Sequence, residues 1–180
     1  MIPVLLLHKR GLCKTVRFRS PVYLGDPINA VKIFNDKEVD ELLVLDIDAT
    51  RLCRPPAMPE LTELAGEALM PMAYGGGITT VEQVRELVYS GFEKVVLGAA
   101  AFEAPGLISE AAGRVGSQSV VACIDVKANW LGKPRAWVRN GTVNTGLHPV
   151  EYARRLEQSG AGELILQSID RDGTFLGYQI

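Results

Sequence analysis

The sequence lacks the marks of several protein classes. Its 180 residues include only 3 cysteines, Cys13, Cys53 and Cys123, whose wide and irregular spacing gives neither a zinc motif nor a redox pair. A net charge of -2 leaves no basic excess for nucleic acid or an anionic membrane. No apolar run approaches the ~20 residues of a membrane-spanning helix, and residues 2–7 are too short for a signal peptide. We therefore expect a soluble, cytoplasmic protein.

Signatures of bound cofactors are missing too. The chain has no cluster of histidine, cysteine and acidic residues at metal-ligand spacing, and no glycine pattern of the dinucleotide-binding type. We therefore expect no metal and no cofactor. A small phosphorylated substrate is compatible with the acidic net charge, because a few backbone N–H groups can hold a phosphate without a basic side chain.

Short apolar runs alternate with amphipathic stretches along the whole chain. The runs are too short for helices and several are continuously apolar, which is typical of strands buried on both faces of a parallel sheet. These predicted strands cover residues 2–7, 42–46, 70–73, 95–97, 120–125 and 164–168. Helix-start signals lie between them, such as Asp26 before Pro27, and Thr79 with Glu82 as a capping box. The pattern predicts a single α/β domain over residues 1–180.

One segment and one repeat stand out from this alternation. Residues 127–142 have no helical period, and we expect a hairpin-like excursion there, either a flap over a site or a plain loop. Residues 41–48 (ELLVLDID) resemble residues 163–170 (ELILQSID), 122 positions later. Four strand–helix units fill that interval, so two such halves give the eight strands of a (β/α)8, or TIM, barrel.

The length of the repeat predicts a chain that ends early for this fold. Two halves require about 244 residues, close to the ~250 that are usual for a TIM barrel. We therefore expect a (β/α)8 barrel of two half-barrel repeats that is truncated after about strand six. The last two β/α units would be missing, and a fragment is the favoured explanation.

Carboxylates follow three of the predicted strands, at the barrel end that usually carries the chemistry. The acids are Asp46 and Asp48 after the second strand, Asp125 at the end of the fifth, and Asp170 and Asp172 after the sixth. Converging carboxylates can do acid–base work. They can equally cap the next helix or pair with basic neighbours, and both interpretations stay open here.

Small residues and charged residues mark two further sets of strand ends. Gly75–Gly77 and Gly98–Ala101 follow the third and fourth strands, where small side chains let phosphate oxygens approach backbone N–H groups, unless they serve ordinary tight turns. At the opposite ends, Glu41, Lys94 and Glu163 begin strands two, four and six. Alternate strands share a layer inside a barrel, so these three predict a charged ring at its floor; solvated side chains that point outward are the alternative.

A series of motifs carries a resemblance to a known family. They are, in order, Gly25–Pro27, Asp40–Leu42, Leu45–Ile47, Gly75–Ile78, Gly116–Gln118, Asn144–Gly146 and Ser168–Thr174. Over essentially the whole chain this succession resembles the cyclase subunit of imidazole glycerol phosphate synthase. The resemblance implies that a glutaminase docks on the barrel floor, and that its ammonia travels through the barrel to a phosphorylated substrate at the rim.

The resemblance also implies roles for single residues. Asp125 matches one of the family's two catalytic aspartates. The implied ammonia gate is Glu41, Lys94 and Glu163, and the implied contacts with the glutaminase are Glu93 and Gln118. The implied substrate- and phosphate-binding positions are Lys14, Gly77, Gly98, Ala99, Asp172 and Gly173.

The chain departs from the family pattern at several of these sites. Leu6 stands where the family has its other catalytic aspartate, and a leucine neither gives nor takes a proton. Gly98 and Ala99 replace an Asn-Thr pair, which leaves backbone donors but removes two side chains. A fourth gate residue, an arginine, would precede Met1, and the second phosphate site would come largely from strands seven and eight.

These departures shape the expected function. The Leu5–Leu7 variant resembles a paralogous branch linked to bacterial surface-sugar biosynthesis. The leading hypothesis is an ammonia-accepting synthase subunit that works with a glutaminase in the amidination or amidation of a phosphorylated or nucleotide-linked sugar. The alternatives are the cyclase of histidine biosynthesis and a barrel without chemistry that only binds and activates the glutaminase.

Overall fold

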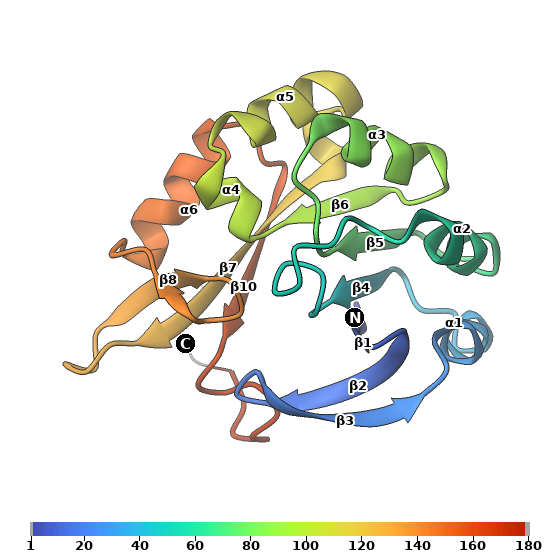
Figure 1. Ribbon diagram of the computed structural model, residues 1–180, viewed down its shortest axis with the longest axis horizontal. Helices are drawn as coiled ribbons and strands as arrows, with labels where there is room; N and C mark the ends of the chain where they lie inside the picture. Colours follow the sequence, from blue (N-terminus) through green and yellow to red (C-terminus); the bar gives the residue numbers. More distant parts are fainter. Residues whose placement is uncertain (1, 179–180) are drawn as a thin grey trace.

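Six parallel strands form the frame of the structure, a computed structural model that describes residues 2–178 (Figure 1). They lie side by side in the order β1-β4-β5-β6-β7-β10. Their bounds are β1 Val4–His8, β4 Leu42–Asp46, β5 Met72–Gly75, β6 Lys94–Leu97, β7 Val120–Ala128 and β10 Glu163–Ser168. All six predicted strands are therefore present, the third two residues later than the sequence pattern placed it.

Helices cover the outer face of this curved sheet (Figure 1). They are α1 Pro27–Asp36, α2 Met58–Gly66, α3 Val81–Tyr89, α4 Ala99–Glu103, α5 Gly106–Val115 and α6 Pro149–Gln158. Alternate strand residues such as Leu42 and Val44 pack against the helices, whereas Leu43, Val96 and Val121 form a second cluster on the inner face. Burial on both faces explains why these strands are apolar without interruption.

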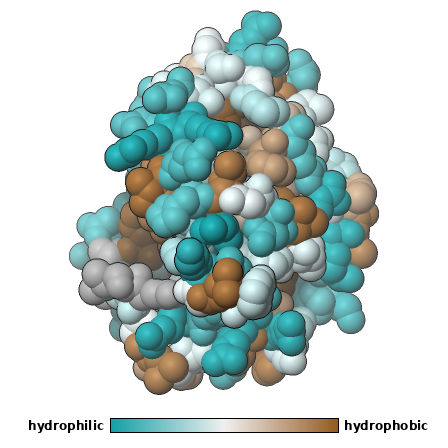
Figure 2. Space-filling model, turned by 90° about the vertical axis from the view of Figure 1, so that its left-hand side faces the viewer, coloured by the Kyte–Doolittle hydropathy of each residue, from teal (hydrophilic) through white to brown (hydrophobic). Residues whose placement is uncertain are grey.

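The parallel α/β architecture confirms the coarse prediction, and closure of the barrel stays a prediction. Among residues 2–178, β10 pairs only with β7, and β1 pairs with β4 and β2. The repeated segments occupy β4 and β10, separated by β5, β6 and β7, as two half-barrels require. The side of the molecule that carries α6 shows apolar side chains scattered among hydrophilic ones (Figure 2).

Two antiparallel hairpins extend the sheet beyond the parallel frame. The first, β2 (Gly11–Val16) with β3 (Arg19–Gly25), follows β1 and was not predicted from the sequence. The second begins on the long strand β7 and continues through β8 (Pro134–Val138) and β9 (Val143–Asn144), which confirms the excursion predicted at residues 127–142. Both hairpins rise at the carboxyl ends of the parallel strands.

One predicted helix start is correct, and another is displaced by one residue. Asp26 caps α1, since its Oδ1 accepts a hydrogen bond from Asn29 N at 2.9 Å and Pro27 follows. The capping box of α3 uses Thr80 and Gln83, so the predicted pair Thr79 and Glu82 was wrong by one residue. Either threonine can act as an N-cap, and the amide of Gln83, not a carboxylate, closes the box.

No helix within residues 2–178 combines the length and the apolar character needed to cross a membrane. The same part of the chain contains no group of three or more histidine, cysteine, aspartate or glutamate side chains placed to hold a metal ion.

Candidate active site

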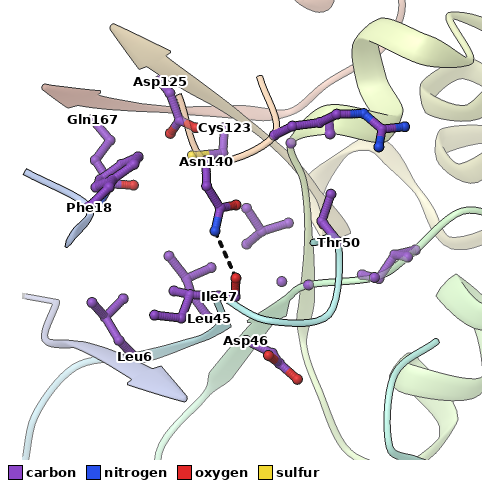
Figure 3. A pocket seen from close by; sticks show the side chains of 18 of the residues that line it. Leu6, Phe18, Leu45, Asp46, Ile47, Thr50, Cys123, Asp125, Asn140 and Gln167 are labelled. Carbon is purple, nitrogen blue, oxygen red and sulfur yellow. Dashed lines mark hydrogen bonds between the residues drawn. The ribbon is translucent and has the colours of Figure 1, made fainter. Parts of the chain in front are cut away.

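A pocket with about 130 Å³ of free space lies at the carboxyl ends of the parallel strands (Figure 3). The inner-face residues that line it from the parallel strands are Leu6, Leu45, Gly75, Val96, Cys123, Asp125 and Gln167. Both hairpins contribute to its wall, Thr15 and Phe18 from the first and Arg139 and Asn140 from the second. The pocket therefore lies at the end of the barrel-like sheet where chemistry is expected.

Asp125 is the acid that points into this pocket. It sits on the inner face of β7, between the outward-facing Ile124 and Val126. Burial raises the pKa of Asp125 to about 7, because the carboxylate loses water without gaining a compensating charge. Near neutral pH this carboxyl group is divided between its acid and base forms, which suits a group that both gives and takes protons.

Leu6 lies across the pocket from Asp125 (Figure 3). The side chain is apolar, so Asp125 has no carboxylate partner on β1. Cys123 lies one inner-face step below Asp125, and burial, together with the Asp125 charge, raises the pKa of its thiol. At neutral pH this thiol stays protonated, so the inner face between these residues carries no second negative charge.

The glycine turn after β5 brings backbone close to the pocket. Gly77 has φ +69°, and a Cβ atom there would lie 2.1 Å from the carbonyl oxygen of Arg54. Gly76 has φ +134° and is packed against Asp46. Both positions therefore require glycine. Gly77, Gly98 and Ala99, all implied phosphate-site residues, line the pocket together.

The two acids after β4 serve mainly to shape the rim. Asp46 Oδ1 accepts hydrogen bonds from the backbone N–H groups of Asp48 and Ala49 at 2.8 and 3.0 Å. Asp48 is buried and accepts hydrogen bonds from Lys9 N at 3.0 Å and Arg51 Nη2 at 2.9 Å. The contacts of Asp46 therefore show the structural role, whereas Asp48 also lies 3.0 Å from Nδ1 of His8.

The acids after β10 hold the two hairpins. Asp172 Oδ2 accepts hydrogen bonds from Thr15 Oγ1 at 2.8 Å and from Phe18 N at 3.0 Å. Gly173, with φ +65°, passes so close to Thr15 that a Cβ atom would lie 2.1 Å from its carbonyl oxygen. Asp170 Oδ2 accepts a hydrogen bond from Ala128 N at 2.9 Å, beside the turn that joins β7 to β8.

Three implied binding residues lie outside the pocket lining. Asp172 and Gly173 sit behind the β2–β3 hairpin that they support. Lys14 is exposed on β2, on the face opposite to the buried Cys13 and Thr15. The role of Lys14 in substrate binding stays a prediction.

The second hairpin supplies pocket residues that sequence reasoning missed. Arg139, Asn140 and Gly141 all have positive φ, between 53° and 72°, so the chain turns sharply toward the pocket after β8. Asn140 Nδ2 donates to the carbonyl oxygen of Ile47 at 2.7 Å, and Arg139 forms a two-point ion pair with Glu103. The Asn-Gly pair at 140–141 was the available signal, since that dipeptide favours such turns.

The opposite end of the inner face carries the charged cluster expected from the spacing. Lys94 Nζ lies 2.9 Å from Glu41 Oε2 and 2.7 Å from Glu163 Oε1, so one ammonium group joins strands β4, β6 and β10. Partial burial alone would lower the pKa of Lys94, but hydrogen bonds to Glu163 and Glu41 raise it. Glu93 and Gln118 are exposed at the same ends of β6 and β7.

Comparisons with known proteins agree with this architecture. A family model described as histidine biosynthesis protein matches residues 1–180. A Vibrio vulnificus protein with the provisional name imidazole glycerol phosphate synthase subunit hisF3 is 47% identical over 100% of this chain and 70% of its own length. A Pseudomonas aeruginosa protein, provisionally named subunit hisF2 of the same enzyme, is 49% identical over 99% of this chain and 71% of its own length.

A third relative carries the enzyme's name without a number. The Alkaliphilus metalliredigens protein named imidazole glycerol phosphate synthase subunit HisF is 39% identical over 100% of this chain and 71% of its own length. The family match spans the whole chain, including the glycine turns and Asp125. The chain therefore belongs to the histidine biosynthesis protein family, as an imidazole glycerol phosphate synthase-like cyclase subunit.

Proposed function

We propose that this chain is the ammonia-accepting subunit of a glutamine amidotransferase that acts on a phosphorylated or nucleotide-linked sugar. The observation that carries the proposal is Asp125, an acid that points into the pocket with a raised pKa, with Leu6 across from it. The family's ring closure is implied to use an aspartate at each of these positions. Addition of ammonia to a carbon that is already electrophilic does not require this pair of aspartates, and Asp125 can supply a proton to the developing oxygen.

The proposed ammonia route runs along the inner face of the sheet. Its lower gate is the ion cluster of Lys94, Glu41 and Glu163, and its upper end is the pocket at Asp125. The surface between them is apolar, with Leu43, Ala73, Val96 and Val121 at its centre. Neutral ammonia crosses such a surface far more readily than ammonium, because moving a charge out of water is costly.

The proposed glutaminase partner would dock at the gate end. Glu93 and Gln118 are exposed there, beside the three charged residues of the cluster. In the same proposal, the backbone of Gly77, Gly98 and Ala99 holds a phosphate of the substrate at the pocket. Ammonia and substrate would thus enter from opposite ends.

The names of two relatives favour a branch separate from histidine biosynthesis. Two relatives that are 47% and 49% identical to this chain carry the numbered names hisF3 and hisF2. A second copy is free to take a different substrate. Surface-sugar amidination or amidation is the reaction that we assign to this branch, in the cytoplasm.

A nitrogen-incorporation assay tests the proposal. The chain is incubated with 15N-labelled ammonium chloride and a panel of phosphorylated and nucleotide-linked sugars, and the products are analysed by mass spectrometry. We expect a gain of one 15N atom in at least one sugar, and none with Asp125→Asn. The proposal would be overturned if the folded wild-type chain labels no sugar, with or without a glutaminase.

The histidine-pathway cyclase is the second candidate, favoured by the identity with the Alkaliphilus protein. Rescue of a histidine auxotroph separates the two. We expect no rescue, because Leu6 removes one of the two acids that ring closure is implied to need. Growth without histidine would favour the cyclase.

A further inference from the structure

A histidine–aspartate pair stands at the end of β1, one inner-face step beyond Leu6. His8 ends β1, and strand alternation places its side chain on the same face as Leu6, whereas Leu5 and Leu7 pack against the outer core. The Nδ1 atom of His8 lies 3.0 Å from Asp48 Oδ2, a residue 40 positions away in the sequence. The strand that has no acid in the pocket thus carries an imidazole two residues beyond Leu6, which lines the pocket.

Asp48 is built to orient this imidazole. It is only 3% exposed, and its carboxylate accepts hydrogen bonds from Lys9 N and Arg51 Nη2. Burial raises the pKa of Asp48, but the hydrogen bonds from Arg51 and Lys9 and the close contact with His8 outweigh it, and the net pKa is lowered. A carboxylate that stays ionised and fixed beside Nδ1 is the arrangement that holds a histidine in one tautomer.

The Asp48 carboxylate is the nearby acceptor for the buried Nδ1 atom of His8. This Nδ1 atom lies 3.0 Å from Asp48 Oδ2 without the alignment of a full hydrogen bond. Such contacts are often misaligned before substrate binds and tighten in the complex. The imidazole side chain is 21% exposed while its Nδ1 is buried, so the exposed part of the ring lies away from Asp48.

We propose that His8, oriented by Asp48, is the second acid–base group of this site. It takes the place of the aspartate that the family has at the position of Leu6. The inference rests on the proposed function. The lone pair of ammonia forms a C–N bond to a carbonyl carbon of the substrate, and the π pair of that carbonyl moves onto its oxygen. Asp125 gives its proton to the oxygen, and Nε2 of His8 takes a proton from the new ammonium nitrogen. The products are a carbinolamine, an ionised Asp125 and an imidazolium paired with Asp48.

The tautomer of His8 tests the pair without any activity assay. The sequence has 2 histidines, so His148, which caps α6 and accepts a hydrogen bond from Val150 N, is an internal reference. In 15N-edited imidazole spectra we expect neutral His8 to carry its proton on Nδ1. In Asp48→Asn the amide can donate to Nδ1, and the proton should move to Nε2. A wild-type His8 that is protonated on Nε2 when neutral would overturn the proposal, because that nitrogen could not act as a base.

Turnover provides the second arm. With the sugar that accepts 15N from ammonium chloride, we expect His8→Gln and Asp48→Asn to lower kcat by about 10²-fold or more, while His148→Gln leaves it unchanged. A His8→Gln variant that keeps the wild-type kcat would overturn the proposal. If wild-type chain labels no sugar, the proposed function fails, and the tautomer still decides whether the pair exists.

Discussion

The two ends of the inner face differ in whether their ionisable groups have charged partners. At the floor, Lys94 is joined to Glu41 and Glu163, so every charge in the cluster has a partner. At the rim, Asp125 is partly buried without a counter-charge, and loss of water raises its pKa to about 7. Paired charges hold one another in fixed positions, whereas an unpaired acid with a raised pKa carries a proton that it can release near neutral pH. The difference separates the proposed gate from the proposed chemistry.

The substitution that tests this difference most strongly is Asp125→Asn, which removes the ionisable carboxyl group at the rim. We expect loss of 15N incorporation by about 10²–10⁴-fold, since one essential acid–base group is gone. The fold should remain, because asparagine fills nearly the same volume. Steady-state assays with ammonium chloride measure the effect, and activity within about threefold of wild type would count against a catalytic role for Asp125.

The same variant has a stability signature with a definite sign. Because the folded pKa is raised above the ordinary 3.8, the folded chain keeps this proton at pH values where the unfolded chain has lost it. The wild type therefore loses stability as the pH rises from about 4 to about 7. Asparagine cannot ionise, so we expect Asp125→Asn to be more stable than the wild type at pH 8 by about 4 kcal/mol, from a pKa difference of about 3, and equal near pH 4. Urea unfolding at both pH values checks this; an equal difference at both would contradict it.

At the glycine turn beside the rim, Gly77→Ala should cost about 2–4 kcal/mol of unfolding free energy. The added Cβ would lie 2.1 Å from the carbonyl oxygen of Arg54, and φ is +69°. Gly66→Ala is the matched control, since a Cβ there meets nothing within 4 Å. Denaturant melts of the two variants compare them, and similar midpoints would show that the turn does not require glycine.

At the floor, Lys94→Met leaves two carboxylates without their shared cation. We expect a loss of about 1–3 kcal/mol in unfolding free energy, because Glu41 stays largely buried and unpaired. Glu163→Gln should cost less than about 1 kcal/mol, because Glu163 is 49% exposed. In turnover, Lys94→Met should impair glutamine-dependent labelling while labelling from ammonium chloride persists. Equal impairment of both would refute a gate at this position.

The smallest effect is expected at the ion pair between Arg139 and Glu103, which lies outside this contrast. Both side chains are more than one third exposed, so water and salt screen the pair. We expect Glu103→Gln to change the unfolding free energy by less than about 1 kcal/mol. Thermal melts at low and high salt measure it; a larger loss would mean that the pair holds the β7–β8 hairpin over the pocket.

The sequence was sufficient for features that repeat or alternate. Apolar runs located the six parallel strands, and the equal spacing of Glu41 and Glu163 in the two repeats predicted that both would meet Lys94. Asp125 was found because it ends a strand whose neighbours are apolar. In each case the side chain's direction follows from strand alternation alone.

Features that depend on distant contacts were not accessible in this way. The β2–β3 hairpin has shifts in register and a mostly exposed second strand, so no clean alternation marks it. The contact of His8 with Asp48 joins residues that only the pairing of β1 with β4 brings together. Asp172 likewise holds Thr15 across 157 positions, which no local pattern predicts.

The titration of Asp125 tests the contrast between floor and rim most directly. The carboxyl 13C shift of this residue, followed by NMR from pH 3 to pH 9 with Asp125→Asn to assign it, gives its pKa in the folded chain. We predict a midpoint of about 7, well above the ordinary 3.8. A midpoint near 4 would mean that the rim acid is as well compensated as the floor charges, and the contrast would fail.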